Sequence, residues 1–258
     1  GSSTSSLMIP WLLQWYGPAV AFGVPGLFMV LATLTFWAGR HRFVHIPPAG
    51  KSFLKDVIGP EGRRVAQRLL IIYALFSVFW SLFDQTGSTW VLQAIKMDRT
   101  ILGYELLPSQ IQAVNPFLII VLIPFFTYVI YPFMARFFAV TSTRKMCMGM
   151  LLAATPFLVS GWIENQLEQG LQPHIGWQLA AYLLLTIAEV MLVVTCMEFS
   201  YTQAPKRMKS LVMALFYLSI SAGNLFTALV NHFIQNADGT SRLAGASYHL
   251  FFATLMGV

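Results

Sequence analysis

The chain has 258 residues, of which 57% are hydrophobic and only 10% are charged, and its mean hydropathy is +0.66. An average soluble domain carries about 25% charged residues. The charges are too few to cover a soluble fold of this length, so the composition excludes an ordinary cytosolic enzyme and a disordered chain. The net charge of +6 leaves nucleic-acid binding open until the basic residues are located.

Long apolar segments predict six membrane-spanning helices, because a span needs about 20 mostly apolar residues. In chain order the segments cover 16–39, 68–92, 114–134, 146–162, 176–198 and 210–233. The absence of strand-like alternation argues against a transmembrane barrel. Both ends, 1–14 and 248–258, resemble partial spans, so we expect a fragment cut inside a helical membrane protein. A cloning remnant at GSSTSS remains an alternative.

The basic residues predict how the spans are oriented. If the loops alternate sides, three basic residues fall on one side, namely Lys96, Arg99 and Arg242. The other thirteen of the sixteen fall on the opposite side: Arg40, Arg42, Lys51, Lys55, Arg63, Arg64, Arg68, Arg136, Arg144, Lys145, Lys206, Arg207 and Lys209. The positive-inside rule assigns the richer side to the cytoplasm. The basic excess therefore indicates topology, and we expect a lipid bilayer rather than nucleic acid as partner.

The longest loop is the basic linker over 40–67. Its HIPPAG stretch is expected to be extended, and GPEGRR is expected to begin the next helix. The linker charges lie either in water or against anionic lipid.

The second span contains the motif FWSLFDQTGSTW, with an acidic residue, Asp84, at membrane depth. Trp80 lies one helical turn before it. A polar stripe is predicted at helical spacing by Ser77, Ser81, Asp84 and Ser88. This face is predicted to line a cavity, with Trp80 as a wall and Asp84 as a gate or ion partner. The alternative is a structural ion pair, and Trp90 fits an aromatic anchor at the membrane interface.

The fifth span contains two further acidic residues, Glu189 and Glu198. Glu198 shares a helix face with Thr195, Tyr201 and Thr202. A carboxylate that alternates between an apolar and a cationic environment can load and release a proton, and it can also bind an ammonium group. A fixed salt bridge is the alternative. Glu189 lies nine residues earlier, half a turn out of phase, which favours a packing or gating pair over substrate contact.

Asn115 begins the span that continues with Pro116. Its amide could orient a peptide bond, but asparagine is also a common helix start, and spacing alone does not decide. We expect no metal site and no cofactor. The two cysteines form no zinc motif, the five histidines lack metal-ligand spacing, and phosphate loops and nucleophile triads are absent.

Two long motifs, FWSLFDQTGSTWVLQA and EFSYTQAPKRMKSLVMALFYLSISAGNL, together resemble the proton-dependent oligopeptide transporter (POT) family of the major facilitator superfamily. YGPAVAFGVPG, RFVHIPP and AVNPFLIIVLIPFF are also similar to that family. The resemblance implies an all-α, polytopic membrane fold of two six-helix halves. The chain would then run from the end of the fifth helix into the twelfth. Residues 1–39 would hold the partial fifth and the sixth helix, 40–67 a cytoplasmic linker, and 68–258 the C-terminal bundle with its last helix truncated.

The resemblance further implies proton-coupled symport of di- and tripeptides across the plasma membrane by alternating access. By carry-over from the family, Trp80 lines the peptide pocket and Asn115 contacts the peptide. Asp84 pairs with a basic residue of the N-terminal half and closes the outer gate. Glu198 binds the peptide amino terminus and couples the proton. The missing N-terminal helices would supply the rest of the cavity.

The chain also departs from the family pattern. Phe216 stands where many bacterial members have a pocket tryptophan, so we expect Phe216 to line the substrate site and the shape of that pocket to differ. We also expect Thr202 to line the substrate site, beside Glu198. The 28-residue linker is too short for the two extra helices that many bacterial members carry. A carrier of nitrate or another small solute remains an alternative within the family. A membrane-embedded enzyme or a channel is a more distant alternative, and the spans contain no nucleophile or metal site for an enzyme.

Overall fold

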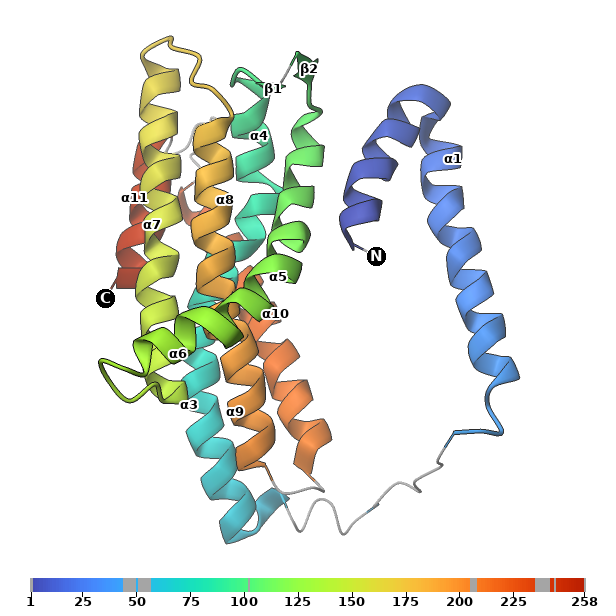
Figure 1. The fold of residues 1–258 in the computed structure, drawn as a ribbon, viewed down its shortest axis with the longest axis vertical. Helices are drawn as coiled ribbons and strands as arrows, with labels where there is room; N and C mark the ends of the chain where they lie inside the picture. Colours follow the sequence, from blue (N-terminus) through green and yellow to red (C-terminus); the bar gives the residue numbers. More distant parts are fainter. Residues whose placement is uncertain are drawn as a thin grey trace.

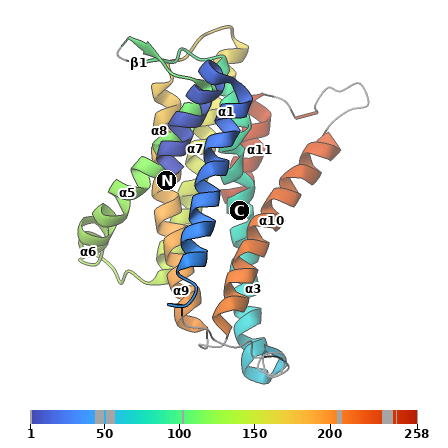
Figure 2. The ribbon, with the colours of Figure 1, turned by 90° about the vertical axis from the view of Figure 1, so that its right-hand side faces the viewer.

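The computed structural model describes residues 2–43, 50, 57–101, 103–204, 208–234, 242–243 and 245–257. Long helices run side by side as a bundle, and α1 (Ser2–Ala38) stands on the side of the bundle where α5 and α10 lie (Figures 1 and 2). The bundle consists of α3 (Pro60–Phe83), α4 (Thr89–Ile95), α5 (Val114–Phe125), α6 (Tyr131–Met134), α7 (Ser142–Glu168), α8 (Gly176–Glu189), α9 (Thr195–Gln203), α10 (Lys209–Ile234) and α11 (Ala246–Gly257).

Within the described residues, six helical segments are long and apolar enough to cross a membrane. They are Ser3–Ala38, Gly62–Ile95, Pro108–Met134, Ser142–Glu168, Gly176–Gln203 and Lys209–Ile234. Each contains most of one of the six apolar segments found in the sequence. The all-α, multi-pass membrane architecture is therefore confirmed.

Helix α1 has two arms that meet at Gly17. This residue has φ 81° and ψ 177°, which is not helical, and the chain reverses direction between the arms (Figure 1). Glycine adopts this positive φ without the steric cost that a Cβ would add. The two arms correspond to the predicted partial span over 1–14 and the full span over 16–39. The first arm contacts the bundle, where Gln110 Nε2 donates to the Leu7 carbonyl oxygen at 3.1 Å.

Three of the spans are not continuous α-helices. The span predicted over 68–92 lies within the candidate span Gly62–Ile95, but α3 ends at Phe83 and a 3-10 turn, Asp84–Gly87, separates it from α4. π-helical turns, Phe126–Ile130 and Val190–Val194, join α5 to α6 and α8 to α9. Each such turn shifts the helical phase, and turns of this kind are frequent at functional sites.

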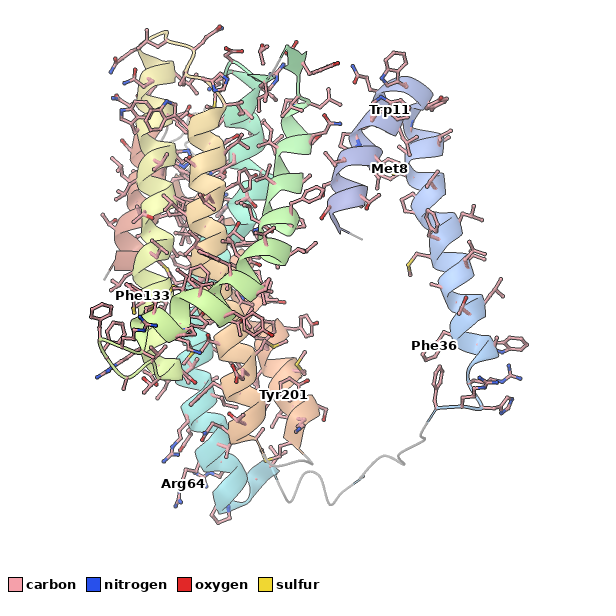
Figure 3. The ribbon with its side chains drawn as sticks, viewed as in Figure 1. Met8, Trp11, Phe36, Arg64, Phe133 and Tyr201 are labelled. Atoms are coloured by element: carbon pink, nitrogen blue, oxygen red, sulfur yellow. The ribbon has the colours of Figure 1, made fainter. Side chains whose placement is uncertain are left out.

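The next helix begins as GPEGRR predicted, with Pro60 in the first turn of α3, eight residues before the predicted span. The HIPPAG stretch lies outside the described residues, apart from Gly50. Arg64 lies near the end of the bundle where α9 ends and α10 begins, while Trp11 lies at the opposite end (Figure 3). This arrangement agrees with the predicted alternation of the loops.

At the end of the bundle away from Arg64, the chain forms a short antiparallel hairpin that the sequence did not predict (Figure 2). It pairs β1 (Thr100–Ile101) with β2 (Tyr104–Glu105). Asp98, just before β1, joins the loop between α7 and α8: its backbone N–H donates to Pro173 O at 3.2 Å, and Ile175 N donates to Asp98 O at 2.8 Å. The two loops at this end of the bundle are therefore hydrogen-bonded to each other.

The bundle core lies between α3, α4, α7, α8, α10 and α11. Trp90 on α4 is only 1% exposed and packs against Tyr182 and Phe157, with ring centroids 4.8 Å and 5.6 Å away. The prediction that Trp90 anchors the membrane interface is therefore wrong.

Candidate functional site

The α3–α10 contact accounts for part of the predicted polar stripe. A Cβ on Gly223 would lie 2.4 Å from Ser77 O and 2.9 Å from Ser81 N, so only glycine allows this approach. Thr227 Oγ1 donates to Ser81 O at 3.1 Å. Ser81 is buried against α10, whereas Ser77 lines a pocket of about 250 Å³ between α3 and α10. Ser88 follows the 3-10 turn, off the α3 face. The prediction of one continuous cavity-lining stripe is wrong.

Trp80 and Phe216 meet in an aromatic cluster between α3 and α10. Their ring centroids are 6.2 Å apart, and Phe76 and Phe83 lie 5.8 Å and 5.3 Å from Trp80. Phe216 is buried, and Trp80 is half-buried with an indole Nε1 that has no hydrogen-bond partner in the described part of the chain. The structure therefore brings these two predicted residues together, with Phe216 supporting Trp80. Their contact with substrate stays a prediction.

Asp84 caps the C-terminus of α3 and begins the 3-10 turn. Its side chain is exposed, and among the described residues its carboxylate forms neither an ion pair nor a hydrogen bond. A gate or ion partner for Asp84 would have to come from outside these residues.

Asn115 on α5 reaches across to α8. Its Nδ2 donates to Glu189 Oε2 at 2.8 Å and to Thr186 Oγ1 at 3.0 Å. Glu189 is therefore paired with Asn115, and its expected role as a packing or gating pair stays a prediction. Asn115 also borders a pocket of about 170 Å³, which is further lined by Ser6, Phe83, Thr86, Gln112, Pro116, Tyr182 and Leu185.

Glu198 and Thr202 lie one turn apart on α9, and both side chains are exposed. Thr202 Oγ1 donates to Phe199 O, at 2.8 Å, within its own helix. The π-helical turn Val190–Val194 lies between Glu189 and Glu198, so the half-turn separation calculated for a regular helix does not apply. The structure does not bring Glu198 to Trp80 or to Asn115 through any contact among the described residues.

Sequence reasoning missed Tyr131. Its hydroxyl is buried near the side chains of Thr195 and Glu198. Lys145 Nζ lies 4.2 Å from the centroid of the Tyr131 ring, in a cation–π contact. The only signal in the sequence was a tyrosine within an apolar run.

A second missed feature is a buried polar cluster near the end of the bundle that carries the β1–β2 hairpin. Gln93 Nε2 donates to Ser160 O at 3.0 Å and to Glu164 Oε2 at 2.9 Å. Ser160 Oγ lies 3.2 Å from His249 Nδ1 and donates to Gln93 Oε1 at 3.1 Å, while Gln178 Nε2 donates to Trp90 O at 2.8 Å. These residues come from four helices, so no spacing in the sequence marks them as a group.

At the hairpin end of the bundle, Lys96 pairs with Glu164 of α7 at 3.5 Å, and Arg99 pairs with Glu105. Hydrogen bonds from the backbone N–H and hydroxyl of Thr100 hold the pKa of Asp98 below its usual range, and His174 adds a smaller effect. Among the described residues, no group of three His, Cys, Asp or Glu could hold a metal ion.

The comparisons with known proteins point to one family. A model of the POT family matches residues 1–60 and 59–249. The chain is 36% identical over 183 residues to "Peptide transporter family 1" of Drosophila melanogaster, covering 58% of this chain and 25% of the fly protein. It is 32% identical over 210 residues to "Solute carrier family 15 member 2" of Homo sapiens, covering 66% and 29% respectively. The chain thus spans between a quarter and a third of the length of these relatives.

Solved structures agree with this likeness. The chain superposes on an auto-inhibited POT family peptide transporter with a TM-score of 0.86 and 32% identity, over 99% of this chain and 65% of that one. It superposes on the POT family transporter PepTSo with a TM-score of 0.85 and 31% identity, over 99% and 66%. The transporter fold expected from the sequence motifs is confirmed, and the matched proteins are named as transporters rather than enzymes.

Proposed function

Because the chain belongs to the POT family of membrane transporters, we propose that it forms part of a carrier that takes up di- and tripeptides together with protons. The carrier works by alternating access in the plasma membrane. Its N-terminal helices complete the cavity, and their basic residues receive Asp84 when the outer gate closes.

The strongest support for this proposal is that an exposed carboxylate lies within a membrane-spanning segment. Glu198 lies inside the candidate span Gly176–Gln203, its side chain is exposed, and it forms no ion pair with any described residue. A carboxylate facing lipid at that position is costly, so an acidic residue of this kind belongs in a water-filled cavity. The remaining helices of the carrier would close such a cavity around it.

In the proposed cycle, peptide and proton enter from the outside while Asp84 is released from its cation. Trp80, backed by Phe216, contacts the peptide side chains, and Asn115 contacts the peptide backbone. Glu198, with Thr202 beside it, takes the peptide amino terminus or the proton. When the site opens to the neutral cytoplasm, deprotonation of Glu198 favours release.

Uptake of labelled dialanine tests this function. The complete transporter that contains this chain is reconstituted in liposomes, and uptake is driven by an acid exterior. We expect saturable uptake accompanied by proton entry, and we expect Glu198→Gln to abolish the pH-driven part. Glu105→Gln is the matched control, because Glu105 is an exposed carboxylate on the outer hairpin.

Undiminished pH-driven uptake by Glu198→Gln would refute the role of that residue. A carrier of nitrate or another small solute would transport its solute without competition from dipeptides. A channel would show uptake that does not saturate.

A further inference from the structure

Helix α7 carries an exposed row of apolar side chains along most of its length. Met148, Leu151 and Leu158 are 37%, 61% and 48% exposed, and their spacing places them on one face of the helix. Trp162 ends the row, with its ring centroid 4.8 Å from that of Trp177, as is typical of aromatic side chains at a membrane interface. Helix α7 lies on the side of the bundle away from α1, so we expect lipid to cover this face (Figures 1 and 2).

Arg144 continues the same row at its other end, one turn before Met148, and its side chain is exposed. A rise of about 1.5 Å per residue puts Arg144 about 27 Å from Trp162 along the helix axis. The hydrocarbon core of a bilayer is roughly 30 Å thick. The two residues therefore mark the two surfaces of the membrane, and Arg144 lies at the level of the lipid headgroups.

Two further cations lie at this end of α7. Arg136 is exposed in the turn between α6 and α7, and Lys145 Nζ lies 4.2 Å from the centroid of the Tyr131 ring. Phe133 and Phe137 are also exposed, with ring centroids 5.2 Å apart, and Phe133 lies at the edge of the bundle away from α1 (Figure 3). Exposed rings beside cations suit the boundary between acyl chains and headgroups, because the rings enter the apolar layer while the charges stay in water.

No carboxylate in the described part of the chain forms an ion pair with any of these three cations. The sequence contains no Asp or Glu between Glu105 and Glu164. Glu198 lies near the Tyr131 hydroxyl, yet it forms no ion pair with Lys145. The guanidinium of Arg144 donates to one acceptor among the described residues, Ala139 O at 2.8 Å, and has further N–H groups to offer. The cluster therefore favours an anion with several acceptor oxygens, such as a phosphate.

We propose that Arg136, Arg144 and Lys145, with Phe133 and Phe137 beside them, bind the phosphate headgroup of an anionic phospholipid. The apolar row on α7 takes the acyl chains of the same lipid. The basic loops predict that this end of the bundle is cytoplasmic, and anionic lipids are concentrated in the cytoplasmic leaflet. This inference goes beyond the proposed transport function and does not depend on which solute is carried.

Lipid titration followed by native mass spectrometry tests the proposal on the complete transporter that contains this chain, purified in detergent. The probe is dioleoyl-phosphatidylglycerol, and the comparison is dioleoyl-phosphatidylcholine, which has the same acyl chains and a phosphate but no net charge. Each cation near the headgroup should contribute a factor of about five, so we expect the first phosphatidylglycerol to bind on the order of 100-fold more tightly. An excess of inorganic phosphate should not displace it.

A triple variant shows whether this preference belongs to the proposed site. It replaces the three cations by glutamine, as Arg136→Gln, Arg144→Gln and Lys145→Gln, and we expect the preference for phosphatidylglycerol to be almost lost. The matched control removes three exposed positive charges from α3 at the same end of the bundle, as Arg63→Gln, Arg64→Gln and Arg68→Gln. The control should keep the preference, because the net charge changes equally but the site is intact.

Three results would overturn the proposal. An equal loss of preference in the control variant would mean that the overall charge, rather than this site, selects the lipid. Equal binding of the two lipids by the unaltered transporter would mean that another part of the carrier covers the surface. Displacement by inorganic phosphate would assign the cations to a free anion. If the triple variant fails to fold, Arg144→Gln alone should lower the preference about fivefold, and an unchanged preference would again overturn the proposal.

Discussion

Two helix contacts of the bundle contain polar side chains within membrane-spanning segments. In one contact the side chain bonds within its own helix, and in the other it bonds to the facing helix. Between α3 and α10, Ser81 Oγ donates to Val78 O of its own helix, and Gly223 brings the two backbones together. Between α5 and α8, the Asn115 side chain bonds to Thr186 and Glu189 of the facing helix. The first contact is closed by small residues, and the second is a side-chain pair beside a pocket.

The difference shows which polar residues mark a site in a membrane helix. A serine hydroxyl can donate a hydrogen bond to a backbone carbonyl one turn earlier in its own helix. A row of serines on one helix face is therefore compatible with ordinary helix packing. An amide N–H can do the same, as Gln85 Nε2 does on Ser81 O at 2.9 Å, but an amide oxygen or a carboxylate finds no free backbone donor inside its own helix and needs one from another helix or from a ligand. Four predictions test this distinction, in order of expected effect.

Gly223→Ala should be the most destabilising change. The added Cβ would meet Ser77 O and Ser81 N, which are backbone atoms that cannot rotate away, so we expect a loss of about 3 kcal/mol in the free energy of unfolding. Thermal unfolding of the purified transporter in detergent measures it. Gly87→Ala is the control, because a Cβ there meets nothing within 4 Å. Equal effects of the two changes would show that the α3–α10 contact is not close-packed.

Asn115→Leu should have an intermediate effect on stability. It leaves the half-buried Glu189 without its amide donor, which costs about 1–3 kcal/mol. The KM for dialanine should rise as well, because the proposed contact with the peptide is lost. Thermal unfolding and liposome uptake measure the two effects. A variant that matches the unaltered protein in both would remove the distinction between the two helix contacts.

Ser81→Ala should change stability by about 0.5 kcal/mol or less. Its hydroxyl bonds only to its own helix, at 2.7 Å from Val78 O, and alanine fills nearly the same space. The same unfolding assay applies. A loss comparable to that of Asn115→Leu would assign the serine stripe a role beyond packing.

Asp98→Asn should have the smallest effect, confined to the outer loops that lie outside both contacts. The pKa of Asp98 is lowered in the folded protein, so its contribution is present above the ordinary aspartate pKa and is lost as the pH falls through the lowered value. Hydrogen exchange at the Thr100 amide, which donates to Asp98 Oδ1 at 3.0 Å, should therefore speed up relative to its intrinsic rate only under strongly acidic conditions. In the variant, the Thr100 amide should be less protected from exchange at neutral pH, and its protection should no longer fall when the pH is made acidic. If the variant still loses protection at acidic pH, Asp98 is not the group responsible.

Much of the fold could be predicted because membrane burial acts on local composition. The six spans follow from the length of the apolar segments, while the orientation inferred from the basic loops stays a prediction. The reversal at Gly17 falls where the sequence separated a partial span from a full one. The sequence missed the break after Phe83 and the two π-helical turns, because these depend on what neighbouring helices accept from the backbone.

The candidate site was predictable in part. Motif resemblance selected Trp80 and Phe216, and the structure places their rings in one cluster. Their roles, and those of Asp84, Asn115, Glu198 and Thr202, stay predictions. The sequence treated Asn115 and Glu189 separately, although they form one pair, because they lie 74 residues apart and no local period connects them.

The sequence by itself determined that this is a multi-pass helical membrane protein of the POT family, because span length, loop charge and motifs are properties of consecutive residues. Tertiary structure alone decided which polar side chains are occupied by the fold and which remain available. The Ser81 hydroxyl bonds to its own helix, and the Trp90 ring is buried in the core. The Asn115 amide nitrogen donates to Glu189. Each outcome depends on the distance between groups on different segments, and the sequence does not contain that distance.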